Sequence, residues 1–248
     1  MMAVYFLSDL HLGAPYFSDS RDAEMRVVRF LESISHDAEA VYLMGDILDY
    51  WYEYRYVVPR GFVRFFGQLA RMTDAGIRVV WYIGNHDIWI NDYIPSELGV
   101  EVIDGYRVET ICGKRFFLSH GDGVGNLPMG FRIIRSVFRN RFCQWMFSGI
   151  HPRWTVPFAY SWSRHSRTSC RPRTKENIDR PWNGLMRFSR DYLASHPGID
   201  FFVYGHLHIL RRGEVAPGCE MVVLGDWLTH FSYARLDDGH LDLLTVPQ

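Results

Sequence analysis

Short hydrophobic runs in this chain repeatedly end in aspartate, histidine or asparagine, and this pattern constrains the fold more than any other feature. The runs are followed by Asp9-Leu10-His11, Gly45-Asp46, Gly84-Asn85-His86, His120-Gly121 and Gly205-His206-Leu207-His208. In α/β sheets, ligands gather at the carboxyl ends of the strands. Adjacent glycines let the backbone turn sharply and keep side-chain bulk away. We therefore expect side chains from five strands to meet at one site.

The residues at these run ends form a donor set that suits divalent metal ions. It consists of two carboxylates, one amide and four imidazoles: Asp9, Asp46, Asn85, His11, His120, His206 and His208. Nitrogen and oxygen donors without a thiolate suit Mn²⁺, Fe²⁺ or Zn²⁺ better than Ca²⁺. The set is large enough for two metals that share one carboxylate. Two metals about 3.5–4 Å apart activate water and stabilise charge on a phosphoryl group. A metal-free set of strand-end hydrogen bonds is the alternative.

The first hundred residues predict a parallel sheet covered by helices. Strands are expected at Val4–Leu7, Ala40–Met44 and Arg78–Ile83, because these runs are short, apolar and rich in β-formers. Helical periodicity predicts helices at Asp22–Ser35 and Phe62–Asp74 between them. This β-α-β-α-β order is typical of a parallel sheet with helices on its face.

The second half predicts another sheet with more antiparallel pairing. Its expected strands are Tyr106–Ile111, Arg115–Ser119, Asp200–Tyr204, Glu220–Leu224, Phe231–Leu236 and His240–Thr245. Hairpin turns are expected at Cys112-Gly113-Lys114 and Asp237-Asp238-Gly239. We expect two sheets packed face to face with helices outside. Gly225-Asp226-Trp227 also follows an expected strand, and it lines the site or forms a turn around a buried tryptophan.

A basic segment interrupts this pattern. Residues 123–187 carry twelve Lys/Arg and two acids, a net charge of +10, whereas the rest of the chain carries −11. We expect residues 1–122 and 188–248 to form the core and residues 123–187 to form a basic, aromatic-rich helical insertion that acts as a lid. Such a charge asymmetry indicates an anionic partner. A solvated basic face is the alternative.

Within this segment, Phe131–Phe147 predicts an amphipathic helix. Apolar residues recur at spacings of three and four, and arginines recur at the same spacing on another face. The apolar residues are Ile134, Phe138, Phe142 and Trp145, and the arginines are Arg132, Arg135 and Arg139. Core packing is the favoured interpretation of the apolar stripe, and a lid or membrane-surface helix is the alternative.

Composition restricts the compartment. No apolar run approaches the roughly 20 residues that a membrane-spanning helix needs, and the N-terminus lacks a signal-peptide pattern. The four cysteines are widely spaced without a CxxC motif, which disfavours a disulfide framework or a zinc knuckle. We therefore expect a reducing cytoplasm.

The motifs together resemble the calcineurin-like metallophosphoesterase superfamily, whose pattern reads D-x-H, G-D-x-x-D, G-N-H-[DE], a later H, and G-H-x-H. The resemblance implies a four-layer α/β/β/α sandwich and two divalent ions. One ion would be bound by Asp9, His11, Asp46 and His208. The other would be bound by Asp46, Asn85, His120 and His206, with Asp46 bridging.

The same resemblance implies roles beside the metals. His86 would be the imidazole that stabilises or protonates the leaving oxygen, oriented by Asp87, and both are candidate catalytic residues. Asp49 and Asp122 fit residues that orient a ligand, and an ordinary turn or cap role is the alternative.

The insertion between His120 and His206 narrows the resemblance to the UDP-2,3-diacylglucosamine diphosphatases of the lipid A pathway. That family implies Mn²⁺, a nucleotide-linked lipid substrate cleaved to UMP and 2,3-diacylglucosamine 1-phosphate, and peripheral contact with the cytoplasmic face of the inner membrane. Arg164 and Arg167, together with Asn85 and His86, are then candidate substrate contacts. The best-known branch has arginine where this chain has His86 and threonine where it has Leu207, so this chain resembles a divergent branch.

Two other functions remain open. A phosphodiesterase or pyrophosphatase acting on nucleotides or nucleic acid would also use the basic segment, although an acidic body disfavours a long strand. A non-enzymatic scaffold would have lost metal ligands, and none is missing from the motifs.

Overall fold

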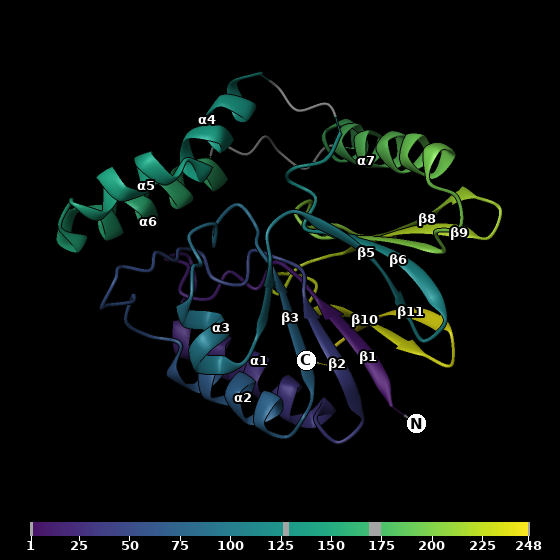
Figure 1. Ribbon diagram of the computed structural model, residues 1–248, viewed down its shortest axis with the longest axis horizontal. Coiled ribbons are helices and arrows are strands. Elements are labelled where there is room, and N and C mark those ends of the chain that lie inside the picture. Colours follow the sequence, from purple (N-terminus) through teal and green to yellow (C-terminus); the bar gives the residue numbers. More distant parts are fainter. Residues whose placement is uncertain (1, 126–128, 169–174, 248) are drawn as a thin grey trace.

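A computed structural model describes residues 2–125, 129–168 and 175–247. Two β-sheets pack face to face, helices cover the outer face of each sheet, and a group of helices stands away from the sandwich (Figure 1). The predicted four-layer α/β/β/α arrangement is confirmed.

The first sheet has the strand order β11-β10-β1-β2-β3-β4. Its strands are β1 (Ala3–Leu7), β2 (Ala38–Leu43), β3 (Arg78–Tyr82), β4 (Glu101–Ile103), β10 (Ser232–Asp237) and β11 (His240–Thr245). Strands β1 to β4 are parallel, whereas β10 runs antiparallel to β1. The assignment of the β10–β11 hairpin to the second sheet was therefore wrong. Ala234 and Leu236 of β10 are fully buried between the sheets, so the hairpin completes the first sheet.

Helices α1 (Ser20–Ile34), α2 (Val63–Asp74) and α3 (Tyr93–Leu98) cover the outer face of the first sheet (Figure 1). Val27 and Leu31 of α1 and Phe65 and Leu69 of α2 are buried at spacings of four, and they join one core cluster with Leu7. The predicted helices are thus confirmed, and α3 is an addition.

The second sheet has the order β5-β6-β7-β9-β8. Its strands are β5 (Tyr106–Ile111), β6 (Lys114–Ser119), β7 (Phe201–Tyr204), β8 (Leu210–Ala216) and β9 (Cys219–Leu224). Strands β6, β7 and β9 are parallel, and the edge strands β5 and β8 are antiparallel to their neighbours. Strand β8 was not predicted, because at this edge most of its residues are exposed or half-buried.

Aromatic residues fill the space between the two sheets. Phe6 stacks on Tyr42 with ring centroids 4.9 Å apart and on Phe116 at 5.7 Å, and Phe116 stacks on Phe201 at 5.0 Å. Because these rings connect β1, β2, β6 and β7, the carboxyl ends of four of the site-bearing strands are held in fixed relation.

The helices that stand away from the sandwich are α4 (Met129–Arg139), α5 (Arg141–Ser148) and α6 (Pro152–Thr168). The single helix expected over Phe131–Phe147 is broken at Asn140, whose side chain accepts hydrogen bonds from Phe142 N and Cys143 N at the start of α5. No residue of α4 or α5 is buried.

The favoured core-packing interpretation of the apolar stripe was wrong for three of its four residues, whereas Phe138 is half-buried and packs on Trp89. Ile134, Phe142 and Trp145 are 43%, 64% and 69% exposed. Arg135 and Arg139 instead face the sandwich and form ion pairs with Asp122 and Asp104. The periodicity was read correctly, but the inward face of α4 carries the arginines.

Residue 187, the expected end of the insertion, does not coincide with an element boundary. That position lies inside α7 (Lys175–Ser195), the helix that covers the second sheet. Trp182, Leu185 and Met186 are already buried in the cluster beneath α7. Trp182 is therefore a core residue of the sandwich.

Candidate metal centre

The carboxyl ends of the site-bearing strands bring six of the seven predicted ligands together, all except Asn85, which belongs to none of the groups below. Three groups have potential ligand atoms that all lie within 4.8 Å of one another. The groups are Asp9, His11 and His208; Asp46, His120 and His206; and His11, Asp46 and His86. Residues up to 199 positions apart in the sequence thus form one cluster.

Asp46 lies between the first two groups. Its Oδ2 is 3.4 Å from His120 Nε2 and 3.7 Å from His11 Nε2. Asp9 Oδ1 is in turn 3.4 Å from His208 Nε2 and 3.8 Å from His11 Nε2. This geometry fits a carboxylate shared by two cations.

Several of these residues have a left-handed backbone conformation, which residues other than glycine avoid. The φ angles are +56° at Asp9, +46° at His11, +54° at Asp46, +65° at His206 and +52° at His208. Such conformations cost about 1–3 kcal/mol each and concentrate at functional sites. The sharp turns direct the first and third side chains of D-x-H and H-x-H toward the ligand cluster.

The glycines of the motifs are required by close packing. A Cβ on Gly84 would overlap the Asp46 carboxylate, and a Cβ on Gly45 would lie 2.5 Å from His120 Nδ1. A Cβ on Gly205 would overlap Ser8 Oγ and lie 2.7 Å from Asp9 Oδ2. Each motif glycine therefore leaves room for a ligand that comes from a different strand.

The ring nitrogens that face away from the cluster have fixed partners. His11 Nδ1 donates to Asp49 Oδ1 at 3.1 Å, and His120 Nδ1 donates to the Met44 carbonyl oxygen at 2.8 Å. His86 Nδ1 donates to the Asp49 carbonyl oxygen at 3.0 Å. Partners of this kind set the tautomer and orientation of a ligating imidazole.

The expectation that Asp87 orients His86 is corrected by these contacts. The Asp87 carboxylate accepts hydrogen bonds from Gly84 N, Ile47 N and Trp81 Nε1, at 2.7, 2.9 and 3.0 Å. Its Oδ2 therefore ties the loop after β3 to Ile47 in the loop after β2, whereas its Oδ1 bonds to Gly84 within its own loop. The residue that contacts His86 Nδ1 is Asp49, which also holds His11.

Asp122 has a different partner from the one expected. Its Oδ2 accepts from Arg135 Nε at 3.0 Å, so it links the loop after β6 to α4. The side chains of Arg164 and Arg167 lie outside the described part of the structure, and their candidate role stays a prediction. For Asp226 the sequence left two roles open, lining the site or forming a turn. Its side chain is buried beside His208.

Burial and neighbouring charges shift the pKa values of the carboxylates in this cluster in opposite directions. Burial alone would raise the pKa of Asp9, but His208 and His11 lower it to about 2. The pKa of Asp46 is likewise held well below its usual range by His120 and His86. Burial lowers the pKa of His206 to about 4, with a contribution from the positive charge of His120. The site therefore favours ionised carboxylates and a neutral His206, as metal ligation requires.

Unsatisfied buried atoms indicate that the donor set fits metal ions. Asp9 Oδ1, Asn85 Oδ1 and His120 Nε2 are buried and make no hydrogen bond. A buried polar atom without a partner is costly, so such atoms call for an explanation. Together with the carboxylates and imidazoles around them, they form an oxygen and nitrogen set suited to divalent first-row metals.

A two-sheet sandwich with this cluster at its strand ends defines a metal-dependent phosphoester hydrolase. Residues 2–210 match the profile of the calcineurin-like phosphoesterases, and the chain belongs to that family.

Relatives match over nearly the whole chain. A protein of Porphyromonas gingivalis named UDP-2,3-diacylglucosamine hydrolase is 40% identical over 97% of this chain and 96% of its own length. A protein of the same name from Histophilus somni is 23% identical over 92% of this chain and 93% of its own length. Among solved structures, a dimetal phosphatase from Danio rerio covers 98% of this chain and 95% of its own, with 14% identity and a TM-score of 0.48.

Proposed function

We propose that this chain hydrolyses the pyrophosphate bond of UDP-2,3-diacylglucosamine, a nucleotide-linked lipid, to UMP and 2,3-diacylglucosamine 1-phosphate. The observation that carries the proposal is the 40% identity, over almost both full lengths, to a relative named for hydrolysis of this compound. The metal-binding cluster supports the reaction type, because hydrolysis of a phosphate anhydride needs stabilisation of phosphoryl charge.

Two ions would be held by seven residues in this proposal. Asp9, His11 and His208 bind one ion, Asn85, His120 and His206 bind the other, and Asp46 bridges them. Mn²⁺ is our first choice, with Fe²⁺ or Zn²⁺ as alternatives, because the set has no thiolate.

Ions bound there would activate water and stabilise negative charge on the phosphorus being attacked. The chain contributes orientation. His86 Nδ1 donates to the Asp49 carbonyl oxygen, so Nε2 is the nitrogen left to contact the leaving oxygen, and it can protonate that oxygen only from the imidazolium form. Arg164 and Arg167 remain candidate phosphate contacts on their sequence position, since paired guanidinium donors fit phosphate oxygens.

The insertion supplies a surface for the lipid part of the substrate and for the membrane that contains it. Residues 123–175 contain no aspartate or glutamate. Large apolar side chains are 43–71% exposed along α4, α5 and α6 and the turns between them: Met129, Ile133, Ile134, Val137, Phe142, Trp145, Met146, Ile150, Trp154 and Phe158. An apolar surface with only basic charge suits an anionic bilayer. We therefore propose peripheral binding to the cytoplasmic face of the inner membrane.

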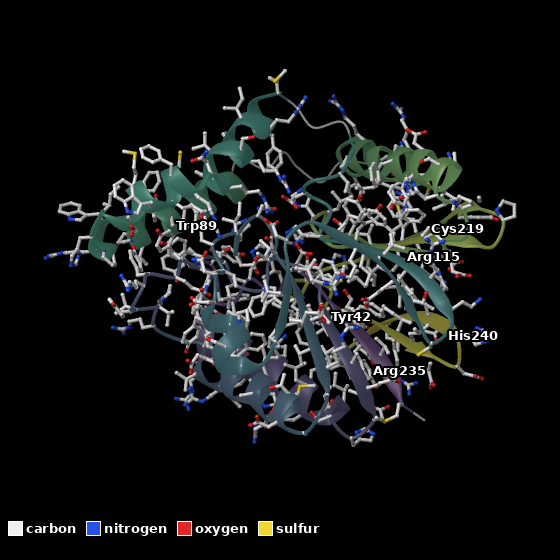
Figure 2. All side chains as sticks on the ribbon, in the orientation of Figure 1. Tyr42, Trp89, Arg115, Cys219, Arg235 and His240 are labelled. Atoms are coloured by element: carbon white, nitrogen blue, oxygen red, sulfur yellow. The ribbon has the colours of Figure 1, made fainter. Side chains whose placement is uncertain are left out.

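No described helix is long and apolar enough to cross a bilayer. Membrane contact in this proposal therefore depends on the exposed surface of α4 to α6, which lies on the same side of the molecule as the carboxyl ends of the strands (Figure 1). Trp89, next to His86 in the loop after β3, lies at the base of this group of helices (Figure 2). Its ring packs on Phe138 and Phe147, and its Nε1 donates to the Phe138 carbonyl oxygen at 2.7 Å.

The experiment that tests the proposal is hydrolysis of UDP-2,3-diacylglucosamine with added Mn²⁺, beside bis-p-nitrophenyl phosphate, cyclic nucleotides and DNA. The expected result is release of UMP at a rate far above that on the other compounds. Turnover of the diesters or DNA with none of the lipid substrate would instead establish the phosphodiesterase alternative.

A further inference from the structure

The turn after β9 contacts the ligands of one proposed metal. This turn, residues 225–232, lies outside the motifs that suggested the site. Its Trp227 N donates to the Asp9 carbonyl oxygen at 3.2 Å, and its Asp226 Oδ2 lies 3.3 Å from His208 Nδ1. Two members of one ligand group, Asp9 and His208, are thus supported by a single segment.

The two oxygens of the Asp226 carboxylate share one partner, Thr229 Oγ1, at 3.0 and 3.3 Å, and otherwise face different groups. Oδ1 accepts hydrogen bonds from Leu228 N, Thr229 N and His230 N at 3.1, 2.7 and 3.1 Å, and these bonds fix the turn. Oδ2 faces His208. Asp226 is fully buried, whereas His208 is 20% exposed, so the carboxylate supports the ligand from the interior.

If His208 binds a metal ion through Nε2, its Nδ1 must carry the ring proton and needs a partner for it. Its Nε2 faces Asp9 Oδ1 at 3.4 Å, so Nε2 is the atom available to a metal and must carry no proton. A carboxylate 3.3 Å from Nδ1 favours the proton on that nitrogen electrostatically, although Nδ1 makes no hydrogen bond of ordinary geometry to it. The same turn therefore closes on itself through Oδ1 and fixes the ligand through Oδ2.

We propose that Asp226 is a positioning residue that holds His208 in the metal-binding tautomer. The inference rests on the proposed metal site and adds to it a residue from a sixth strand end. It predicts that Asp226 is needed for the binding of one of the two ions, in addition to fixing the conformation of the turn.

Asp226→Asn separates these two roles. The asparagine Oδ1 can still accept the three backbone N–H groups, but its Nδ2 donates where Oδ2 accepted. His208 Nδ1 would then accept, and the ring proton would move to Nε2 and block the ligand atom. Asp19→Asn is the matched control, because Asp19 also accepts backbone N–H groups, from Arg21 and Asp22 at the start of α1, but is exposed and belongs to none of the ligand groups.

Mn²⁺ binding to chelator-treated protein is the readout, measured by equilibrium dialysis. Wild type and Asp19→Asn should bind Mn²⁺ equally, whereas Asp226→Asn should weaken one class of sites by about 10–100-fold and leave the other unchanged. Metal-free Asp226→Asn should unfold thermally at the same midpoint as wild type. Unchanged Mn²⁺ affinity would overturn the inference, and so would a lowered midpoint with both classes weakened alike.

A double-mutant cycle with His208→Ala completes the test. If Asp226 acts through His208, adding Asp226→Asn to His208→Ala should weaken Mn²⁺ binding no further. An additional loss of the same size in both backgrounds would show that Asp226 acts through the turn and would overturn the inference. A wild-type protein that binds no Mn²⁺, Fe²⁺ or Zn²⁺ would instead show that the proposed metal site itself is wrong.

Discussion

Single residues in this site are constrained more by what surrounds them than by their own propensities. Five proposed ligands have left-handed backbones, and the glycines between them leave no space for a methyl group. The strain is maintained because each ligand is held by hydrogen bonds from another strand. Asp9 Oδ2, for example, accepts from Ser8 Oγ at 2.6 Å and from His206 N at 2.9 Å.

Gly205→Ala should therefore abolish Mn²⁺ binding at the cluster and lower the free energy of unfolding by about 1–3 kcal/mol. The new Cβ would overlap Ser8 Oγ and approach Asp9 Oδ2. Denaturant unfolding and a metal-content assay measure the two effects.

Gly67→Ala is the control for that substitution. Nothing lies within 4 Å of the Cβ it would add, and its position in α2 favours alanine. It should leave metal binding intact and stabilise the protein by about 0.5–1 kcal/mol. Equal effects of the two substitutions would contradict the packing argument.

Motif spacing in the sequence was sufficient to locate the proposed ligands that follow the carboxyl end of a strand. Asp9, Asp46, Asn85, His120 and His206 each follow one, and parallel strands must release them at a common edge. The roles of supporting residues could not be predicted in this way. Whether a carboxylate such as Asp87 or Asp49 reaches an imidazole depends on loop conformations that bring together residues up to 40 positions apart.

At the scale of elements, helix ends also depend on distant partners. Helix α2 begins after Phe62, which has a left-handed backbone and gives no side-chain cap. Glu24 of α1 fills this role, because its Oε1 accepts from Arg64 N and Phe65 N at 2.9 and 3.1 Å. The pairing couples the two helices that cover the first sheet.

Glu24→Ala should destabilise the protein by about 1–2 kcal/mol, since two buried or half-buried N–H groups lose their acceptor. Glu24→Gln keeps an oxygen acceptor and should cost clearly less. Chemical denaturation of both variants measures the difference. Equal losses would show that the charge of the side chain, and not the capping bond, matters, because Gln keeps the length of Glu.

The elements that the sequence predicted wrongly share one cause. Periodicity shows that a helix or strand has two faces, but not which neighbour each face meets. The α4 stripe was assigned to the core, although Ile134 is exposed and Arg135 faces inward to Asp122. The β10–β11 hairpin was assigned to the wrong sheet for the same reason, because both sheets offer an edge to an apolar strand.

For the whole molecule, charge and exposed apolar surface are unequally distributed along the chain. The core carries the negative charge, while the insertion carries the positive charge and exposed aromatics. Each arginine near an anionic bilayer contributes about 1 kcal/mol of binding free energy, and buried aromatic surface adds to it.

The double substitution Trp145→Ser/Trp154→Ser should lower binding to vesicles containing phosphatidylglycerol by at least about tenfold, because two side chains that are 69% and 71% exposed lose their apolar surface. Co-sedimentation at low and high salt measures it. Val63→Ser is the control, since Val63 is 75% exposed on α2, away from the insertion. Equal binding by all three proteins would remove the membrane role of this surface.

The central claim is that side chains from five strand ends bind a pair of divalent ions. The most direct measurement is the number of Mn²⁺ ions per chain after chelator treatment and reloading, compared between wild type and Asp46→Ala. The account predicts two ions in the wild type and at most one in the variant, because Asp46 lies between the two ligand groups. A wild type that binds no ion, or an Asp46→Ala variant that retains both with unchanged affinity, would contradict it.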